Sequence, residues 1–184
     1  MRLFVSLAAL MVCMSPAPAA AQLQVLGQSA AATCYEHALA QRHDVRAMQD
    51  CDIAVRDARV TRRDRAATLV NRGILMIHQN RHNSALEDFA AAEALGDFAP
   101  SALAVNRACA LIGLGRFDEA VAQTDLAIRA GDTREADAWL NRGIALEAMD
   151  ELAAAYDSYR QARRLRPDWQ RPQRELSRFR ITSR

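Results

Sequence analysis

Three asparagines stand at a constant spacing of 35 residues, and each is followed by arginine and a small residue. They are found in Asn71-Arg72-Gly73, Asn106-Arg107-Ala108 and Asn141-Arg142-Gly143. An asparagine amide offers both a donor and an acceptor, so it can pair with the N–H and C=O groups of an extended peptide. Alternatively, each asparagine bonds within its own repeat. The neighbouring arginines are expected to be structural, with packed stems and guanidinium groups paired to acids of adjacent helices.

Residues that would indicate catalysis or metal binding form no known motif. The sequence contains no nucleophile elbow, phosphate-binding glycine loop, Cys-x-x-Cys or His-Glu-x-x-His. All 24 basic residues are arginine, which excludes a Schiff-base lysine. His78 and His82 have the i, i+4 spacing of a metal pair, but Asn80 and Arg81 between them indicate a turn. We therefore expect no metal, no cofactor and no enzymatic activity.

The remaining reactive groups also favour structural roles. Cys109 has no histidine or acid near it, so we expect a buried, inert thiol. Adjacent carboxylates stand near the start of an expected second helix, where acids suit the positive end of the helix dipole. These pairs are Glu87-Asp88, Asp118-Glu119 and Asp150-Glu151.

The composition of the chain favours a helical protein. Of the 184 residues, 51% are hydrophobic, 25% charged and only 5% aromatic, with 7 Gly and 5 Pro. This mixture speaks against a β-sandwich or barrel. Charge is unevenly distributed: residues 22–159 carry 14 Arg against 20 acids, whereas residues 160–184 carry 9 Arg against 2 acids. Such asymmetry suggests an oriented electrostatic surface rather than general affinity for nucleic acid.

The spacing of 35 extends to other columns and predicts stacked helical hairpins. Small residues recur at Ala85, Ala120 and Ala155, and again at Ala92, Ala127 and Ala162. Within each copy, two apolar-periodic stretches flank a short turn, at 79–81, 114–116 and 149–151. A single hairpin cannot bury its apolar face alone, so the copies are expected to stack around a continuous core.

These columns resemble the tetratricopeptide repeat (TPR), a helix-turn-helix unit of 34 residues. Gly73 and Gly143 match its small position 8, Trp139 its large position 4, and Pro167 its frequent proline. The resemblance implies an all-α, right-handed α-solenoid with repeats at 66–99, 101–134 and 136–169. Leu69 and Ala104 at position 4, Thr124 at position 24 and arginine at position 7 depart from the pattern.

A degenerate hairpin precedes the three repeats within 22–65, with helices expected over 31–41 and 44–59. Ala47, Cys51 and Ala54 match positions 20, 24 and 27 of the repeat, and Cys34 then falls at position 7. Since positions 7 and 24 face one another in this family, the resemblance implies a Cys34–Cys51 disulfide. The alternative is two unpaired, buried cysteines.

The two ends of the chain lie outside the repeats. Residues 170–184 are expected to form a capping helix and basic tail, with Pro172 near its start, helix through Ile181, and Leu176 and Phe179 facing inward. Residues 1–21 have one positive charge, a short apolar run and an Ala-x-Ala site, which predicts a signal peptide cleaved near Ala21 and a periplasmic or otherwise exported protein. Cys13 would suit a lipoprotein, but it follows Val12 rather than a small residue.

The leading hypothesis is a non-enzymatic, exported scaffold that binds a peptide or protein segment in its concave groove. The first helices line that groove in this family, and the asparagine column is similar to the ladder in the repeats of the O-linked N-acetylglucosamine transferase family. The family's carboxylate clamp matches at Asn106, but Val70, Ile74 and Asp137 stand where it needs other residues. Asn141 stands where it needs arginine, so the departures argue against that chaperone-type mode.

An alternative hypothesis assigns binding of an anionic envelope surface or polymer to the arginine-rich C-terminal end. Contact with a membrane surface and self-association are compatible with both hypotheses, and no nucleic acid is expected. The arginines concerned are Arg160, Arg163, Arg164, Arg166, Arg171, Arg174 and Arg178.

Overall fold

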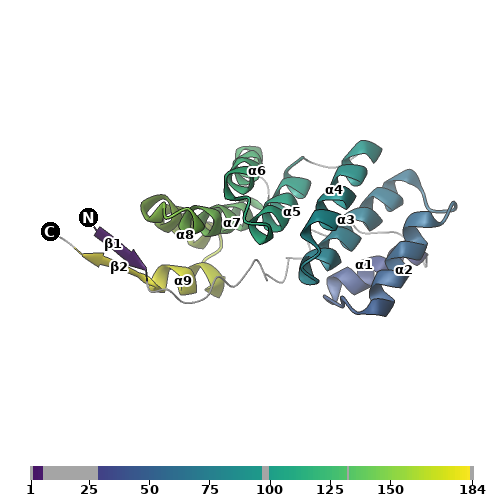
Figure 1. Cartoon of the computed structure of the whole chain (residues 1–184), viewed down its shortest axis with the longest axis horizontal. Helices are drawn as coiled ribbons and strands as arrows, with labels where there is room; N and C mark the ends of the chain where they lie inside the picture. Colours follow the sequence, from purple (N-terminus) through teal and green to yellow (C-terminus); the bar gives the residue numbers. More distant parts are fainter. Residues whose placement is uncertain (1, 6–28, 97–99, 132, 183–184) are drawn as a thin grey trace.

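The computed structural model describes residues 2–5, 29–96, 100–131 and 133–182, and these residues form four helical hairpins, a ninth helix and a two-stranded sheet (Figure 1). The predicted all-α solenoid is confirmed. The first helices of the hairpins are α1 (Ala30–Leu39), α3 (Arg62–His78), α5 (Pro100–Gly113) and α7 (Glu135–Ala148). Their second helices are α2 (Val45–Arg56), α4 (His82–Leu95), α6 (Phe117–Ala130) and α8 (Leu152–Leu165), and α9 (Gln170–Ser177) follows.

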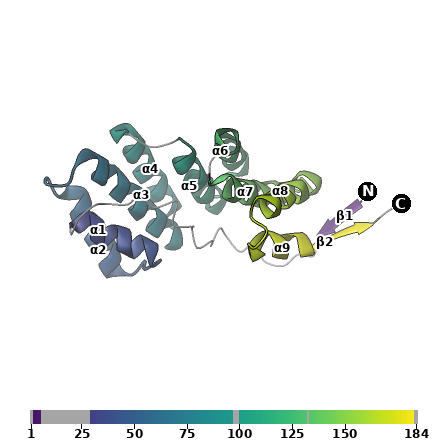
Figure 2. The ribbon, with the colours of Figure 1, turned by 180° about the vertical axis from the view of Figure 1, so that it is seen from behind.

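The hairpins stack in chain order, as Figures 1 and 2 show from opposite sides. Each first helix packs on the next first helix, so α1, α3, α5 and α7 form a continuous row. Each second helix packs on its own first helix and on the first helix of the next hairpin. No comparable contact joins successive second helices within the described ranges. The row of first helices therefore lies on the inner side of the curve.

The inter-helix turns of the three repeats share one backbone conformation, and the turn of the first hairpin has it as well, with Gln41 at φ 53°. Asn80, Gly115 and Asp150 stand 35 residues apart and have positive φ angles of 59°, 72° and 63°. The next residue donates its N–H to a carbonyl five residues earlier, at 2.9 Å in every copy. Asparagine, aspartate and glycine tolerate this left-handed conformation best. The predicted turns at 79–81, 114–116 and 149–151 are confirmed.

Small residues of the first helices receive large residues of the second helices. A Cβ added at Gly73 would lie 2.5 Å from the ring of Phe89, and one at Gly143 would lie 2.5 Å from the ring of Tyr159. Both rings are fully buried. In the α5–α6 hairpin, the middle one of the three repeats, the equivalent residues are Ala108 and Thr124, and both are fully buried. There alanine replaces glycine on the first helix, and threonine replaces the aromatic residue on the second. These columns set how closely the two helices of a hairpin approach.

One first helix begins earlier than the repeat pattern predicts. Helix α3 begins at Arg62, one turn before the expected start at Ala66. Thr61 caps it, because its hydroxyl accepts the N–H of Asp64 at 3.1 Å and donates to the Asp64 carboxylate at 2.8 Å. Such a cap satisfies groups that would otherwise be unpaired at the helix start.

The C-terminal helix is shorter than expected. The expectation of helix through Ile181 is wrong beyond Ser177: α9 ends there, and β2 (Phe179–Thr182) follows. Phe179 is buried against Tyr156 and Tyr159, and Leu176 packs on the same cluster, which confirms that both residues face the last hairpin. The β-branched residues of β2 favour strand over helix.

Strand β2 pairs with the other end of the chain. It runs antiparallel to β1 (Arg2–Val5), with Val5 opposite Phe179 and Arg2 opposite Thr182. Arg2–Val5 lie within the predicted signal peptide, so this pairing describes the uncleaved chain. Residues 6–21 of the predicted signal peptide, including Cys13 and the site near Ala21, lie outside the described residues.

Candidate functional site

The asparagine column lies on three successive first helices, with Asn71 on α3, Asn106 on α5 and Asn141 on α7. All three side chains are buried, with exposed fractions of 0%, 6% and 5%. Their helices form the inner row of the array. The structure thus places the amides on the predicted helices, but as covered groups rather than as an open ladder.

Two of the amides, those of Asn71 and Asn106, lack hydrogen bonds that burial normally requires. Neither Nδ2 nor Oδ1 of Asn71 has a partner, and Nδ2 of Asn106 has none. Asn141 Nδ2 lies 3.9 Å from Sγ of Cys109, a long contact with a weak acceptor. A buried polar atom without a partner costs about 1–3 kcal/mol. The alternative in which every asparagine bonds within its own repeat does not describe Asn71.

The arginine column connects adjacent hairpins, as predicted. Arg72 bonds both oxygens of Asp88 in its own hairpin, at 2.6 and 2.7 Å, and Asp52 of the preceding hairpin at 2.7 Å. The hydrogen bond to Asp88 raises the pKa of Arg72 above its usual value. Asp88, one of the adjacent carboxylates noted in the sequence, therefore has a structural role as the partner of Arg72.

The other two arginines repeat this arrangement. Arg107 bonds Glu93 of the preceding hairpin at 2.7 Å. Arg142 bonds Asp125 of the preceding hairpin at 2.9 Å and Ser158 of its own hairpin at 3.0 Å. Each arginine therefore fixes one hairpin to the one before it, directly beside the asparagine column.

Three of the positions that a carboxylate clamp would use hold residues of other types. Val70 and Ile74 are buried apolar residues. Asp137 is buried and paired with Arg166 at 3.0 Å. Asp137 therefore adds no positive charge at this place, because it is an acid already paired with an arginine.

The arginine-rich end divides into engaged and exposed side chains. Arg166 pairs with Asp137 and stacks on Trp169 at 4.4 Å. Arg178 bonds Glu147 at 2.6 Å and Glu175 at 2.7 Å. Arg160 lies 3.6 Å from Asp157, and Arg171 is partly buried. The exposed members that form no ion pair with described residues are Arg163, Arg164 and Arg174.

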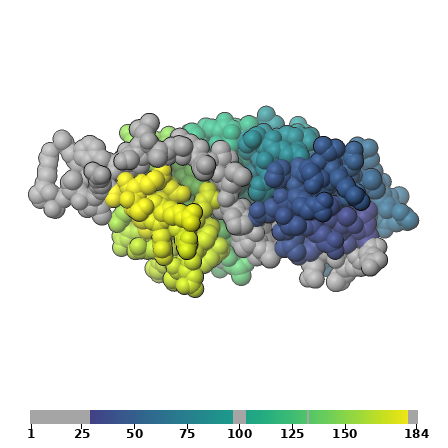
Figure 3. Space-filling view, turned by 90° about the horizontal axis from the view of Figure 1, so that it is seen from below, coloured from purple at the N-terminus to yellow at the C-terminus, as the bar shows by residue number. Residues whose placement is uncertain are grey.

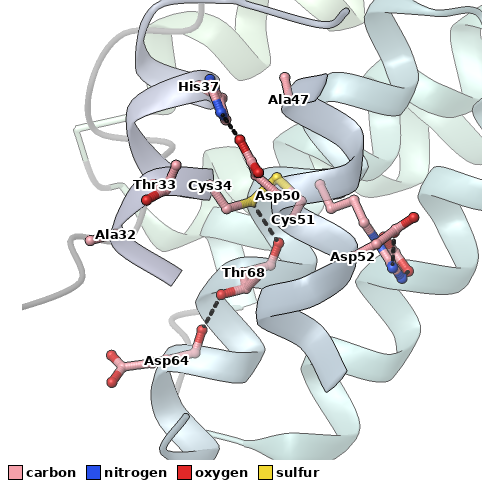
Figure 4. Close-up of a disulfide and its surroundings, with 12 residues drawn as sticks. Ala32, Thr33, Cys34, His37, Ala47, Asp50, Cys51, Asp52, Asp64 and Thr68 are labelled. Carbon is pink, nitrogen blue, oxygen red and sulfur yellow. Dashed lines mark hydrogen bonds and ion pairs between the residues drawn. A yellow bond between two sulfur atoms is a disulfide. The ribbon is translucent and has the colours of Figure 1, made fainter. Parts of the chain in front are cut away.

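A disulfide bond and a polar contact join the two helices of the first hairpin (Figure 4). In the structure Cys34 and Cys51 form a disulfide with Cα atoms 4.7 Å apart, and both residues are fully buried. One turn away, His37 Nε2 lies 2.8 Å from Asp50 Oδ2. Sγ of Cys34 also lies 3.9 Å from the carbonyl oxygen of Thr68 on α3.

His78 and His82 lie on different helices. His78 ends α3 and His82 begins α4, as the turn between them predicts. His78 stacks on His43, and His82 packs against Gly113 of the next hairpin. Over the described ranges, no group of three or more histidine, cysteine or acidic residues could hold a metal ion. Likewise, none of the described helices combines the length and apolar character needed to cross a bilayer.

Cys109 is more accessible than the sequence suggested. It lies on α5 and is half-buried rather than buried, packed at the edge of the core between the second and third hairpins. Its sulfur contacts the amide of Asn141 on the next first helix. The thiol therefore belongs to the same inner row as the asparagine column.

Comparison with known proteins supports the architecture. No family model matches the sequence, and no curated protein matches it. Among solved structures, the first TPR domain of the human RPAP3 protein superposes with a TM-score of 0.55 and 26% identity, covering 61% of this chain and 87% of that one. The chain has a TPR-like fold. The first TPR of Spaghetti (RPAP3), solved with the HSP90 peptide SRMEEVD, gives a TM-score of 0.54 with the same identity and coverage.

Proposed function

We propose that this TPR-like protein is a non-enzymatic scaffold that binds an extended peptide or protein segment along its inner row of helices. The observation that carries the proposal is the set of unpaired polar atoms on Asn71 and Asn106. The backbone of an extended peptide offers the N–H and C=O groups that these amides lack. The solved TPR structure with an HSP90 peptide supports the general mode.

Binding would differ from that structure in what it recognises. The inner row offers amides, and the acid Asp137 stands where a clamp would need a cation. Recognition of main-chain groups would therefore set affinity, and a free carboxylate would contribute little. Because the amides are buried, an incoming peptide must displace the groups that cover them.

The test replaces the amides by an apolar group of similar shape. Asn71→Leu removes two unpaired buried atoms, so it should raise the free energy of unfolding by about 1–3 kcal/mol. The triple change to leucine at 71, 106 and 141 should weaken peptide binding at least tenfold. The probe is a 12-residue peptide selected from a random display library on the full chain, with affinity measured by fluorescence anisotropy.

A matched control makes the same substitution at an asparagine outside the column. Asn83→Leu alters the same residue type at an exposed position on α4 and should leave binding unchanged. Affinity should also change little between low and moderate salt. Unchanged affinity in the triple variant would contradict the proposal. A steep loss with salt that follows Arg163, Arg164 and Arg174 would favour the arginine-rich end instead.

We further propose that the protein is exported, with cleavage near Ala21 and a periplasmic or extracellular location. An oxidising compartment would maintain the Cys34–Cys51 disulfide. Cleavage there would remove β1 from the mature chain. Mass spectrometry of the cell-envelope fraction should find Gln22 as the first residue and the two cysteines linked. Contact with a membrane surface is part of the arginine-end alternative, and self-association is compatible with both modes of binding.

A further inference from the structure

The outer face of α2 carries apolar side chains that lie exposed to solvent. Val45 is 73% exposed and Ile53 is 59% exposed, more than any other large hydrophobic residue described. The buried residues of α2 lie on its opposite side and are Ala47, Met48, Cys51 and Ala54. With about 100° between successive residues, the solvent face is centred on Gln49, flanked by Val45 and Ile53 one turn away on either side.

This face lies at the end of the array that has no cap among the described residues. The last hairpin is covered by α9, whereas the first hairpin packs on α3, from its inner side. Figure 3 shows the first hairpin and the C-terminal end at opposite ends of the molecule. Terminal units of a solenoid need a polar outer face to stay soluble as monomers. Here the outer helix instead presents two isolated aliphatic groups.

We propose that this face binds the same face of a second copy, with the two α2 helices antiparallel around a two-fold axis through Gln49. The sequence of α2 suits that symmetry. A residue that precedes Gln49 by a given number of positions comes opposite the residue that follows Gln49 by the same number. Val45 then meets Ile53 of the second copy on both sides of the axis. An isologous contact of this kind makes a closed dimer.

The charges of the face are complementary under the same symmetry. Arg46 comes opposite Asp52 of the second copy, again twice. Asp52 bonds Arg72 through Oδ1, and its side chain remains 40% exposed, so Oδ2 can accept a second arginine. Further out, Arg56 comes opposite Arg42 of the second copy, a like charge that Asp44 partly offsets from 3.6 Å. The pattern would be lost if the helices ran parallel.

A single helix pair buries less surface than a permanent dimer needs, so the dimer is expected to be weak. Interfaces below about 1,200 Å² are typical of transient complexes. Sedimentation velocity of the full chain should therefore show a 20.3 kDa monomer at low micromolar concentration and twice that mass toward millimolar concentration.

Two substitutions distinguish dimerisation through this face from non-specific hydrophobic association. Val45→Glu places an acid against Ile53 and next to Asp52 of the second copy, and it should weaken dimerisation at least tenfold. Leu126→Glu is the matched control, because Leu126 is 45% exposed on α6 and outside the face. Both sites are exposed, so both variants should keep wild-type helicity. A chain that stays monomeric up to 1 mM, or equal effects of the two variants, would overturn the proposal.

Cross-linking tests the position of the axis. In a background with Cys13→Ser and Cys109→Ser, Gln49→Cys should form a disulfide-linked dimer at least tenfold faster than Ala122→Cys, an exposed control on α6. Only a residue beside a two-fold axis meets its own copy at disulfide distance. Equal rates at the two positions would contradict the antiparallel pairing. The face lies away from the asparagine column, so these results are independent of peptide binding.

Discussion

The two ends of the helical array close their hairpins in different ways. In the α7–α8 hairpin, the ring of Tyr159 fills the space above Gly143 and is covered in turn by Phe179 from beyond α9. In the α1–α2 hairpin, a disulfide joins Cys34 to Cys51, the residue at the same register position as Tyr159. A buried ring stabilises a joint only when neighbours cover it, whereas a covalent bond needs none.

The difference follows from what lies outside each hairpin. The last hairpin has a cap that completes its core, with Leu176 and Trp169 packed against the same cluster. The first hairpin packs on α3, and its outer helix faces solvent. The middle hairpin, with a neighbour on both sides, uses only Ala108 and Thr124 at the equivalent positions. Thus the covalent closure occurs in the hairpin that packs on one side only, whereas the ring closures of Phe89 over Gly73 and Tyr159 over Gly143 occur in hairpins that are covered on both sides.

Truncating the aromatic joint should have the largest effect. Tyr159→Ala removes a fully buried ring that also donates a hydrogen bond to Glu147 at 2.8 Å. We expect a loss of about 4 kcal/mol in the free energy of unfolding. Thr124→Ala, at the same position of the middle hairpin, should cost only about 1 kcal/mol. Urea denaturation of both variants measures this, and similar losses would show that the aromatic joint is not special.

Removing the disulfide should have the next largest effect, and it should be local. Its loop of about 16 residues corresponds to roughly 3 kcal/mol in the chain-entropy model. In Cys34→Ala/Cys51→Ala, hydrogen exchange should accelerate in α1 and α2 and remain slow in α7 and α8. Cys109→Ala is the control for loss of a cysteine. Uniform acceleration along the chain would mean that the first hairpin is not an independently closed unit.

Replacing Gly143 and Tyr159 by the residue types of another hairpin tests directly whether the two positions are coupled. Gly143→Ala places a methyl group 2.5 Å from the Tyr159 ring, so we expect a loss of about 1–3 kcal/mol from overpacking. In a Tyr159→Thr background the same change reproduces the Ala108–Thr124 pair of the middle hairpin, and it should be neutral or stabilising. A double-mutant cycle measures the coupling, which should exceed about 1 kcal/mol. Additive effects would refute the pairing.

The repeat columns explain why the hairpins and their turns were predictable. Gly73, Gly143 and the turn residues Asn80, Gly115 and Asp150 are constrained by local geometry, which is visible in a single sequence at fixed spacing. The arginine column was predictable for a similar reason, since a charged residue on a packed helix must find a partner.

The early start of α3 was missed, although the sequence carries a local signal for it. Thr61 is followed three residues later by Asp64, and a hydroxyl and an acid at this spacing are typical of a capped helix start. The structure shows both parts of the cap, since the Thr61 hydroxyl accepts the N–H of Asp64 and the Thr61 carbonyl accepts the N–H of Arg65 at 2.9 Å. The repeat register predicted a later start because it counts only positions that pack between helices.

Features that depend on distant parts of the chain were not predictable. The pairing of Arg2–Val5 with Phe179–Thr182 joins the two ends of the sequence, and no local pattern indicates it. The burial of Asn71 depends on what lies over the inner row, which a column of asparagines does not reveal. The division of the arginine-rich end depends on acids from other helices, such as Glu147 and Asp137.

The contact between hairpins adds a smaller, pH-dependent effect to this comparison. His82 is 6% exposed, its Nδ1 has no partner, and its ring lies where a Cβ on Gly113 of the next hairpin would be. Burial lowers the pKa of His82 below its usual value, so protonation favours the unfolded chain. The contribution of neutral His82 to the free energy of unfolding should be complete above the pKa of about 6.5 that histidine has in the unfolded chain. It should decrease as the pH falls below that value.

Replacing the histidine ring by one that does not titrate isolates this effect. His82→Phe should flatten the decline of the melting temperature between pH 7.5 and pH 5, while leaving the value at pH 7.5 nearly unchanged. Part of the decline should persist, because burial and the neighbouring His43 also lower the pKa of His78. Combining His82→Phe with His78→Phe should remove more of it. If the single variant kept the full wild-type decline, the joint between α4 and α5 would not be the source of the acid sensitivity, and the hairpins would differ only in how they close internally.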